Sequence, residues 1–70
     1  MDIRVRTGYS GEVAATVIQR RMLAGEECVL VEFSQTNRQW IPIDDRHLLL
    51  TDEQRKQIKY LPWYAGRKGL

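Results

Sequence analysis

Seventy residues with a mass of 8.2 kDa provide for one small domain and leave no room for a second core or a large enzyme cleft. Hydrophobic residue types make up 43% of the chain, too large a share for a disordered segment. No apolar run approaches the roughly 20 residues that a membrane-spanning helix needs. The formal net charge is only +2, so the total charge alone does not identify a nucleic-acid-binding protein.

The cysteine content and the N-terminal segment indicate the cellular setting. Cys28 is the single cysteine, so the chain can form neither an internal disulfide nor a multi-thiolate metal site. No long apolar stretch follows Met1, and no secretory signal is predicted. We therefore expect an intracellular protein, cytoplasmic or nuclear, with no cofactor, no metal and no membrane partner.

Basic residues are concentrated near the C-terminus. Residues 1–50 carry six basic and seven acidic side chains, whereas residues 51–70 carry five basic and two acidic ones. No acidic residue follows Arg55. An anionic partner would therefore bind at this end of the chain.

Three segments in the first 45 residues have the composition of β-strands. Residues 3–6 alternate apolar with basic side chains, and residues 8–11 follow as a glycine-containing turn. Residues 28–33 and 39–43 are rich in β-branched and aromatic types and enclose a polar turn, which predicts a hairpin. Proline cannot donate to a strand ladder, so Pro42 is predicted at a sheet edge or a bulge.

The segment 12–24 is ambiguous between strand and helix. Its β-branched residues, concentrated between positions 13 and 18, favour a strand. Its other residues are mostly helix formers, with Ser10 placed as an N-cap and Gly25 as a stop signal. We predict a strand here, with Gly25 and Glu26 closing a hairpin, and keep a helix as the alternative.

The C-terminal third begins with a clear helix signal. Residues 47–50 form either a short helical turn or one more strand. Thr51 and Gln54 have the spacing of a capping box, so a helix begins there. It must end by Leu61, because Pro62 disfavours the α conformation of the residue before it. The predicted organisation is a β body (1–50), a C-terminal helix (51–61) and a basic aromatic tail (62–70).

Read as strands, residues 3–50 resemble the small five-stranded SH3-like barrels, Tudor-type domains in particular. The likeness lies in the order of strands and turns and in the closing residues from Asp45 to Leu48. The predicted fold class is therefore mostly β: a small five-stranded SH3-like (Tudor-like) barrel with a short C-terminal helix. A compact βαββα α+β domain, with the segment 12–24 helical, is the alternative.

The resemblance implies a binding role. Tudor-type domains commonly bind methylated lysine or arginine in an aromatic cage, and other barrels of this class bind nucleic acid or proline-rich peptides. Tyr9 and Phe33 fall at positions similar to those of cage residues and are candidates for a peptide groove. Val13 stands where a further aromatic residue often follows the turn, so the cage is incomplete.

The reactive residue types do not form a catalytic pattern. Cys28 begins an apolar strand and is predicted to be a buried structural thiol. His47 is the only histidine, and one thiol and one imidazole do not make a metal site. Asp44 and Asp45 are neighbours, so on a strand they would point to opposite faces and could not act together as acid and base. We predict that the protein is not an enzyme and has no small-molecule substrate.

Aromatic and basic residues together indicate a binding surface. If Ile41 faces the core, Trp40 and Arg38 face outward and could form a stacking platform, unless other parts of the chain cover Trp40. The tail interleaves cations with aromatic rings, a combination that suits unpaired bases and phosphates. The candidate contact residues for a nucleic acid or other partner are Arg38, Trp40, Lys59, Trp63, Tyr64, Arg67 and Lys68.

Two functions follow from these features. The first is a recognition module for single-stranded RNA or DNA, or a part of nucleic-acid-associated machinery. The second is an adaptor or regulator that binds a peptide, including a methylated one, or a globular protein. The aromatic tail could also dock on the domain itself, and self-association through an uncovered β edge stays open.

Overall fold

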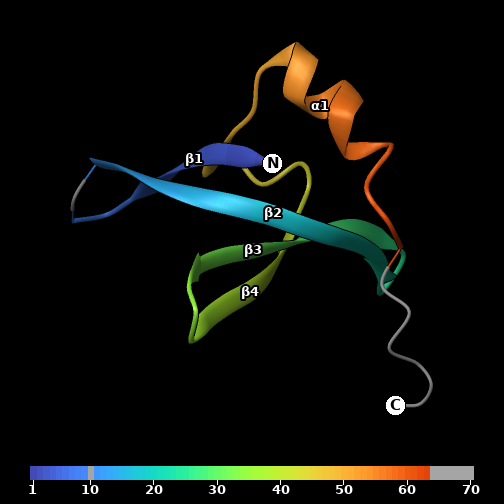
Figure 1. Ribbon diagram of the computed structural model, residues 1–70, viewed down its shortest axis with the longest axis horizontal. Coiled ribbons are helices and arrows are strands. Elements are labelled where there is room, and N and C mark those ends of the chain that lie inside the picture. The colour runs from blue at the N-terminus through green and yellow to red at the C-terminus, as the bar shows by residue number, and fades with distance from the viewer. Residues whose placement is uncertain (10, 64–70) are drawn as a thin grey trace.

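The computed structural model describes residues 1–9 and 11–63 (Figure 1). Neighbouring strands are antiparallel, and their order across the sheet is β4-β3-β2-β1-β5. The mostly β class with a short C-terminal helix is confirmed. In chain order the elements are β1 (Asp2–Thr7), β2 (Gly11–Leu23), β3 (Glu26–Ser34), β4 (Asn37–Pro42), β5 (Leu48–Leu49) and α1 (Asp52–Ile58).

The sheet is open and is not closed into a barrel. β5 has only two residues, and both pair with β1. β4 pairs with β3 alone, so β4 and β5 are the two edges of the described sheet. Pro42 lies at the end of an edge strand, as predicted. The prediction of a closed barrel is corrected to a five-stranded antiparallel sheet.

β2 is one strand of 13 residues, so the alternative helix over segment 12–24 is wrong. Pairing explains why helix-forming residues such as Gln19 and Met22 adopt a strand: both pair with β3. The register shifts at Ile18, which has no partner on β3 and is therefore a β-bulge. Before the bulge Val17 pairs with Val31, and after it Arg20 pairs with Val29.

The bulge reverses the alternation of side chains along β2. Val17 points to the same face as its buried partner Val31. Three residues further on, Arg20 points to that same face beside the buried Val29. A regular strand would place residues 17 and 20 on opposite faces. The bulge therefore turns Arg20 toward the side of the sheet that carries the core.

The β2–β3 hairpin closes through a two-residue turn. Leu23 pairs with Glu26, and the two residues between them both have positive φ, 52° for Ala24 and 82° for Gly25. Two successive positive φ values are the mark of a type I′ turn, whose twist matches that of the flanking strands. The turn thus lies one residue earlier than the position at which the sequence predicts it.

The core lies between one face of the sheet and α1. Its buried members come from β1, β2, β3, β5 and α1, and they are Ile3, Val5, Ala15, Val17, Val29, Val31, Leu48 and Ile58. Cys28 is also buried but points to the other face, since its partner is Arg21 rather than Arg20. The burial predicted for this thiol is confirmed.

α1 begins at the predicted cap and covers the core with one residue. The amide of Gln54 donates to Thr51 Oγ1 (3.1 Å), and the Gln54 side chain accepts from the Thr51 amide (2.9 Å). The Gln54 side-chain amide also donates to the carbonyl of Asp2 (3.0 Å), which fastens the helix beside β1 (Figure 1). Ile58 is the only buried residue of α1.

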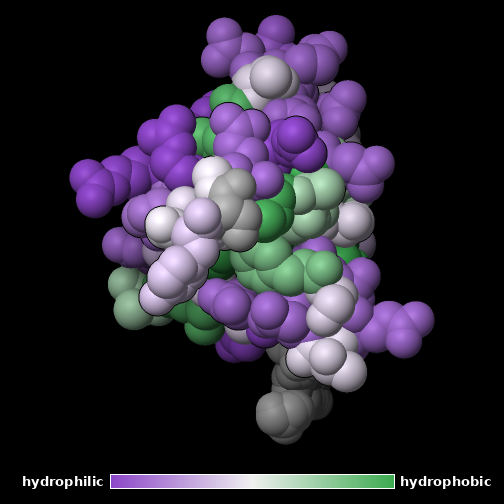
Figure 2. All heavy atoms as spheres, turned by 90° about the vertical axis from the view of Figure 1, so that its left-hand side faces the viewer, coloured by the Kyte–Doolittle hydropathy of each residue, from purple (hydrophilic) through white to green (hydrophobic). Residues whose placement is uncertain are grey.

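Polar side chains surround the apolar residues on the surface. Figure 2 shows a band of apolar groups between hydrophilic ones on the side of the molecule where the β1–β2 and β3–β4 hairpins end. No helix in the described part of the chain is long and apolar enough to cross a membrane.

Candidate functional site

The two tryptophans lie on opposite faces of the sheet. The guanidinium of Arg20 is 4.0 Å from the centroid of the Trp63 ring, and that of Arg21 is 5.5 Å from the centroid of Trp40. Arg20 and Arg21 are consecutive strand residues and point to opposite sides. The structure therefore does not bring Trp40 and Trp63 into one surface.

Trp63 is held against the edge of β2. Along this edge Met1 exchanges hydrogen bonds with Val17 (2.8 and 3.1 Å), and beyond the end of β1 the carbonyl of Pro62 accepts from the Arg20 amide (3.3 Å). Trp63 follows in a parallel bridge to Arg20 and retains half of its surface exposed. The residue is thus docked on the domain, but its ring is only partly covered.

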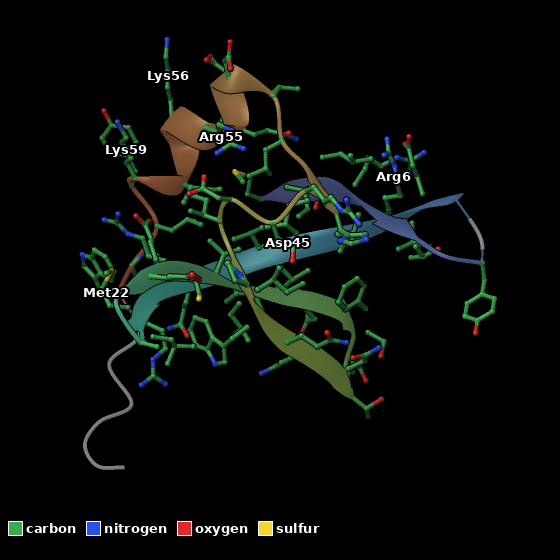
Figure 3. The ribbon with its side chains drawn as sticks, turned by 180° about the vertical axis from the view of Figure 1, so that it is seen from behind. Arg6, Met22, Asp45, Arg55, Lys56 and Lys59 are labelled. Atoms are coloured by element: carbon green, nitrogen blue, oxygen red, sulfur yellow. The ribbon has the colours of Figure 1, made fainter. Side chains whose placement is uncertain are left out.

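Exposed cations and rings gather where α1 ends, and we call this group the C-terminal surface: Lys56, Lys59, Tyr60, Trp63 and Met22. Figure 3 places Lys59 and Met22 at the same end of the molecule, with Lys56 on the adjoining turn of the helix. Tyr60 is 88% exposed and Met22 is 54% exposed. Among residues 1–9 and 11–63, neither lysine has an ion-pair partner. The lysines can therefore attract an anion.

Arg38 and Trp40 lie together on β4, but their surroundings differ from those predicted. Arg38 Nε is 2.9 Å from Glu32 Oε2 on the neighbouring strand, so an acidic side chain neutralises its charge. Trp40 is half-buried, faces its strand partner Leu30 and contacts Arg21. This pair is a less cationic site than the C-terminal surface.

A groove of about 420 Å³ runs along the β4 edge, and we call it the β4 groove. Residues of β1, β3 and β4 line it, together with the turn that holds Asp45 and His47. Its full lining is Val5, Arg6, Thr7, Phe33, Gln39, Trp40, Ile41, Pro42, Asp45 and His47. Tyr9, fully exposed in the β1–β2 turn, is not part of it. The structure therefore does not bring Tyr9 and Phe33 together as one groove.

Two hydrogen bonds fix the part of the groove that Asp45 and His47 line. The backbone amide of His47 donates to Asp45 Oδ1 (2.8 Å), and His47 Nδ1 lies 2.9 Å from the same oxygen. These two hydrogen bonds, the backbone one foremost, lower the pKa of the Asp45 carboxyl below its ordinary value. Asp45 is therefore ionised at neutral pH, and the groove has a fixed negative charge on one side.

Asp45→Asn should lower the free energy of unfolding at neutral pH, and the difference from the parent protein should disappear in acid. A carboxyl whose pKa is lower in the folded than in the unfolded chain stabilises the fold above the unfolded pKa of about 3.9, and the contribution disappears as the pH falls through the folded value. Because the pair is partly exposed, we expect a difference of about 1 kcal/mol or less. Urea unfolding of both proteins between about pH 3 and pH 7 measures it.

The matched control is Asp44→Asn, which changes the net charge equally. The Asp44 side chain is 91% exposed, and its ion-pair partner within the described residues is Arg55, at 3.6 Å. If both variants lose the same stability with the same pH dependence, the hydrogen bonds between Asp45 and His47 are not the cause.

A second groove, of about 560 Å³, has the opposite character. It lies between the β2–β3 turn and the segment after β4, and its carboxylates are Glu26, Glu27, Asp44 and Asp45. Because its lining includes four acidic and no basic residues, this groove does not suit a phosphate backbone. Within the described residues, no group of three or more potential ligands could hold a metal ion.

The thiol of Cys28 is not an activated nucleophile. Burial raises its pKa, and the nearby Glu26 carboxylate raises it further. The Sγ atom lies 3.8 Å from the carbonyl oxygen of Glu26, two residues earlier in the same strand. The thiolate population at neutral pH is thus smaller than that of an ordinary cysteine.

Three of the candidate contact residues, Tyr64, Arg67 and Lys68, lie outside the described residues. Two residues of β2 were not predicted as part of a site: Arg20, which stacks on Trp63, and Met22, which is exposed and points to the same face as Arg20. Both point to the face of the sheet that holds Trp63 because of the bulge at Ile18. The amino-acid composition of β2 does not predict that bulge.

Compared with protein-family models, with curated proteins and with solved structures, the chain matches none.

Proposed function

We propose that the protein is a non-enzymatic recognition module that binds single-stranded nucleic acid at the C-terminal surface. The observation that supports this most directly is that exposed Tyr60 and half-exposed Trp63 follow closely in the chain after Lys56 and Lys59, which have no acidic partner in the described chain. Unpaired bases stack on aromatic rings, and lysines neutralise phosphates. A double helix would not offer its base faces to such a surface.

The sequence beyond Trp63 adds to the same chemistry. Tyr64, Arg67 and Lys68 supply a further ring and two further cations, and no acidic side chain lies between Trp63 and the C-terminus. With Lys56 and Lys59 they make four cations available to phosphates. A group of positive charges near one end of the chain attracts a polyanion and orients it toward that end.

The proposal predicts binding that weakens steeply with salt. Four phosphate contacts on a single strand correspond to a slope of about −2.8 in log K against log salt. The affinity for an oligouridylate of about 12 nucleotides should therefore fall about 50-fold between about 50 and 200 mM salt. Fluorescence anisotropy with a labelled oligonucleotide measures both affinity and slope.

Variants of the exposed lysines distinguish binding at the C-terminal surface from nonspecific electrostatic attraction of the oligonucleotide to the whole protein. Lys59→Ala should reduce the slope by about 0.7, whereas Lys56→Ala and Lys59→Ala together should reduce it by about twice as much. A duplex of equal length serves as the competitor and should bind more weakly. Binding without salt dependence, or no binding at tens of micromolar, would contradict the proposal.

The second candidate function is a protein-binding adaptor or regulator that uses the β4 groove. One observation favours it: Phe33 and Trp40, from the two candidate sets, line the same groove beside the ionised Asp45. This arrangement would suit the cationic or apolar side chain of a peptide, methylated peptides included, and is compatible with the SH3-like or Tudor-like likeness. Such binding would tolerate salt and would not depend on Lys68.

A further inference from the structure

Arg20 contacts the segment that follows α1 through both its side chain and its backbone. Its Nε donates to the carbonyl of Leu61 (3.1 Å), and its guanidinium lies 4.0 Å from the centroid of the Trp63 ring. Its backbone amide donates to Pro62 (3.3 Å). One β2 residue thus contacts three consecutive residues after α1.

A carboxylate fixes the orientation of this guanidinium. Arg20 Nη1 lies 3.6 Å from Glu27 Oε2, and the Arg20 side chain is only 15% exposed. Glu27 is the strand partner of Met22, which lies two residues after Arg20 on the same face of β2. The side chains of Glu27 and Arg20 therefore point to the same face of the sheet. The charge of Arg20 is therefore neutralised within the domain and is not offered to a phosphate.

The guanidinium covers one face of the indole. A planar cation stacks on an aromatic face through cation–π attraction, which a compact ammonium group matches less well in this geometry. Trp63 nevertheless remains half exposed. The exposed part is where a base can stack, while the opposite face is occupied by the protein.

We propose that Arg20 is the positioning residue of the nucleic-acid site: it holds the Trp63 ring so that one face receives a single stacked base. This inference rests on the proposed function and adds a residue that does not itself contact the ligand. A ring fixed before binding loses less conformational freedom when the base arrives, so the affinity is higher. The salt dependence is unaffected, because Arg20 neutralises no phosphate.

The test compares Arg20→Met and Arg20→Lys with Arg21→Met in a Trp40→Phe background, in which Trp63 is the only tryptophan left. Arg21 is the matched control because it is the adjacent arginine and points to the other face. Arg20→Met should weaken oligouridylate binding by about 2- to 30-fold, with the salt slope unchanged. Arg20→Lys should give a smaller loss, and Arg21→Met should change the affinity by less than about 2-fold.

Acrylamide quenching of Trp63 emission without ligand gives a readout independent of binding. Arg20→Met should make the ring more accessible to the quencher, and Arg21→Met should not. Undiminished binding by Arg20→Met, or a salt slope reduced by about 0.7, would overturn the positioning role while the proposed function stood. A parent protein that does not bind the oligonucleotide at all would overturn both.

Discussion

Ile58→Ala is expected to lower the free energy of unfolding by about 2–5 kcal/mol. Ile58 is completely buried and is the only buried side chain of α1, so it is the principal apolar contact between helix and core. Its truncation leaves a cavity that the antiparallel sheet below cannot easily fill. A domain this small has only about 5 kcal/mol of stability, and most of it would be lost. Urea unfolding followed by circular dichroism measures the change.

Gln57→Ala is the control for this experiment. Gln57 is the preceding residue of the same helix and is exposed, so its replacement should change the unfolding free energy by less than about 0.5 kcal/mol. A loss of under about 1 kcal/mol in Ile58→Ala would show that the helix contributes little to the core. In that case the C-terminal surface would have no rigid support.

Local chemistry made most of the fold predictable. The hairpin across residues 34–38 follows from two β-rich segments and a polar turn, and β3 and β4 pair as expected. The capping box at Thr51 and Gln54 depends on two side chains three residues apart, and both of its hydrogen bonds are present. These features depend on near neighbours in the chain, which a sequence shows directly.

Long-range geometry was not predictable in the same way. Closure of a barrel requires hydrogen bonds between the two edge strands of a sheet, and the edge strands β4 and β5 of the described sheet do not pair with each other. Whether Trp40 and Trp63 share one surface depends on the face of the sheet that each ring occupies. That depends on the register of β2 and on the path of residues 61–63, neither of which composition specifies.

The bulge at Ile18 is the particular feature that changes the candidate site. Counted without it, the alternation from Val17 would carry Arg21 to the core side and Arg20 to the other. With it, Arg20 faces the core side and meets Trp63. One extra residue in a strand therefore decides which arginine supports the aromatic ring.

Trp63→Ala should weaken binding to single-stranded oligonucleotides by about 5- to 150-fold, because a stacked base contributes about 1–3 kcal/mol. The ring is half exposed and lies at the end of the described chain, so its loss should cost the fold little. Trp63→Phe keeps an aromatic face and should recover part of the affinity. Anisotropy titration at one low salt concentration measures the three affinities, and urea unfolding confirms that each variant is folded.

Tyr9→Ala is the control for Trp63→Ala, and a variant of the β4 groove separates this proposal from the protein-binding alternative. Tyr9 is a fully exposed ring in the β1–β2 turn and is not part of the C-terminal surface, so its removal should leave oligonucleotide affinity unchanged. A peptide-binding adaptor that uses the β4 groove would instead lose its ligand in Phe33→Ala, because Phe33 lines that groove and Tyr9 does not. If Trp63→Ala and Tyr9→Ala weaken oligonucleotide binding equally, the rings act only as nonspecific contacts. The C-terminal surface would then have no distinct role, because its geometry would no longer explain the affinity.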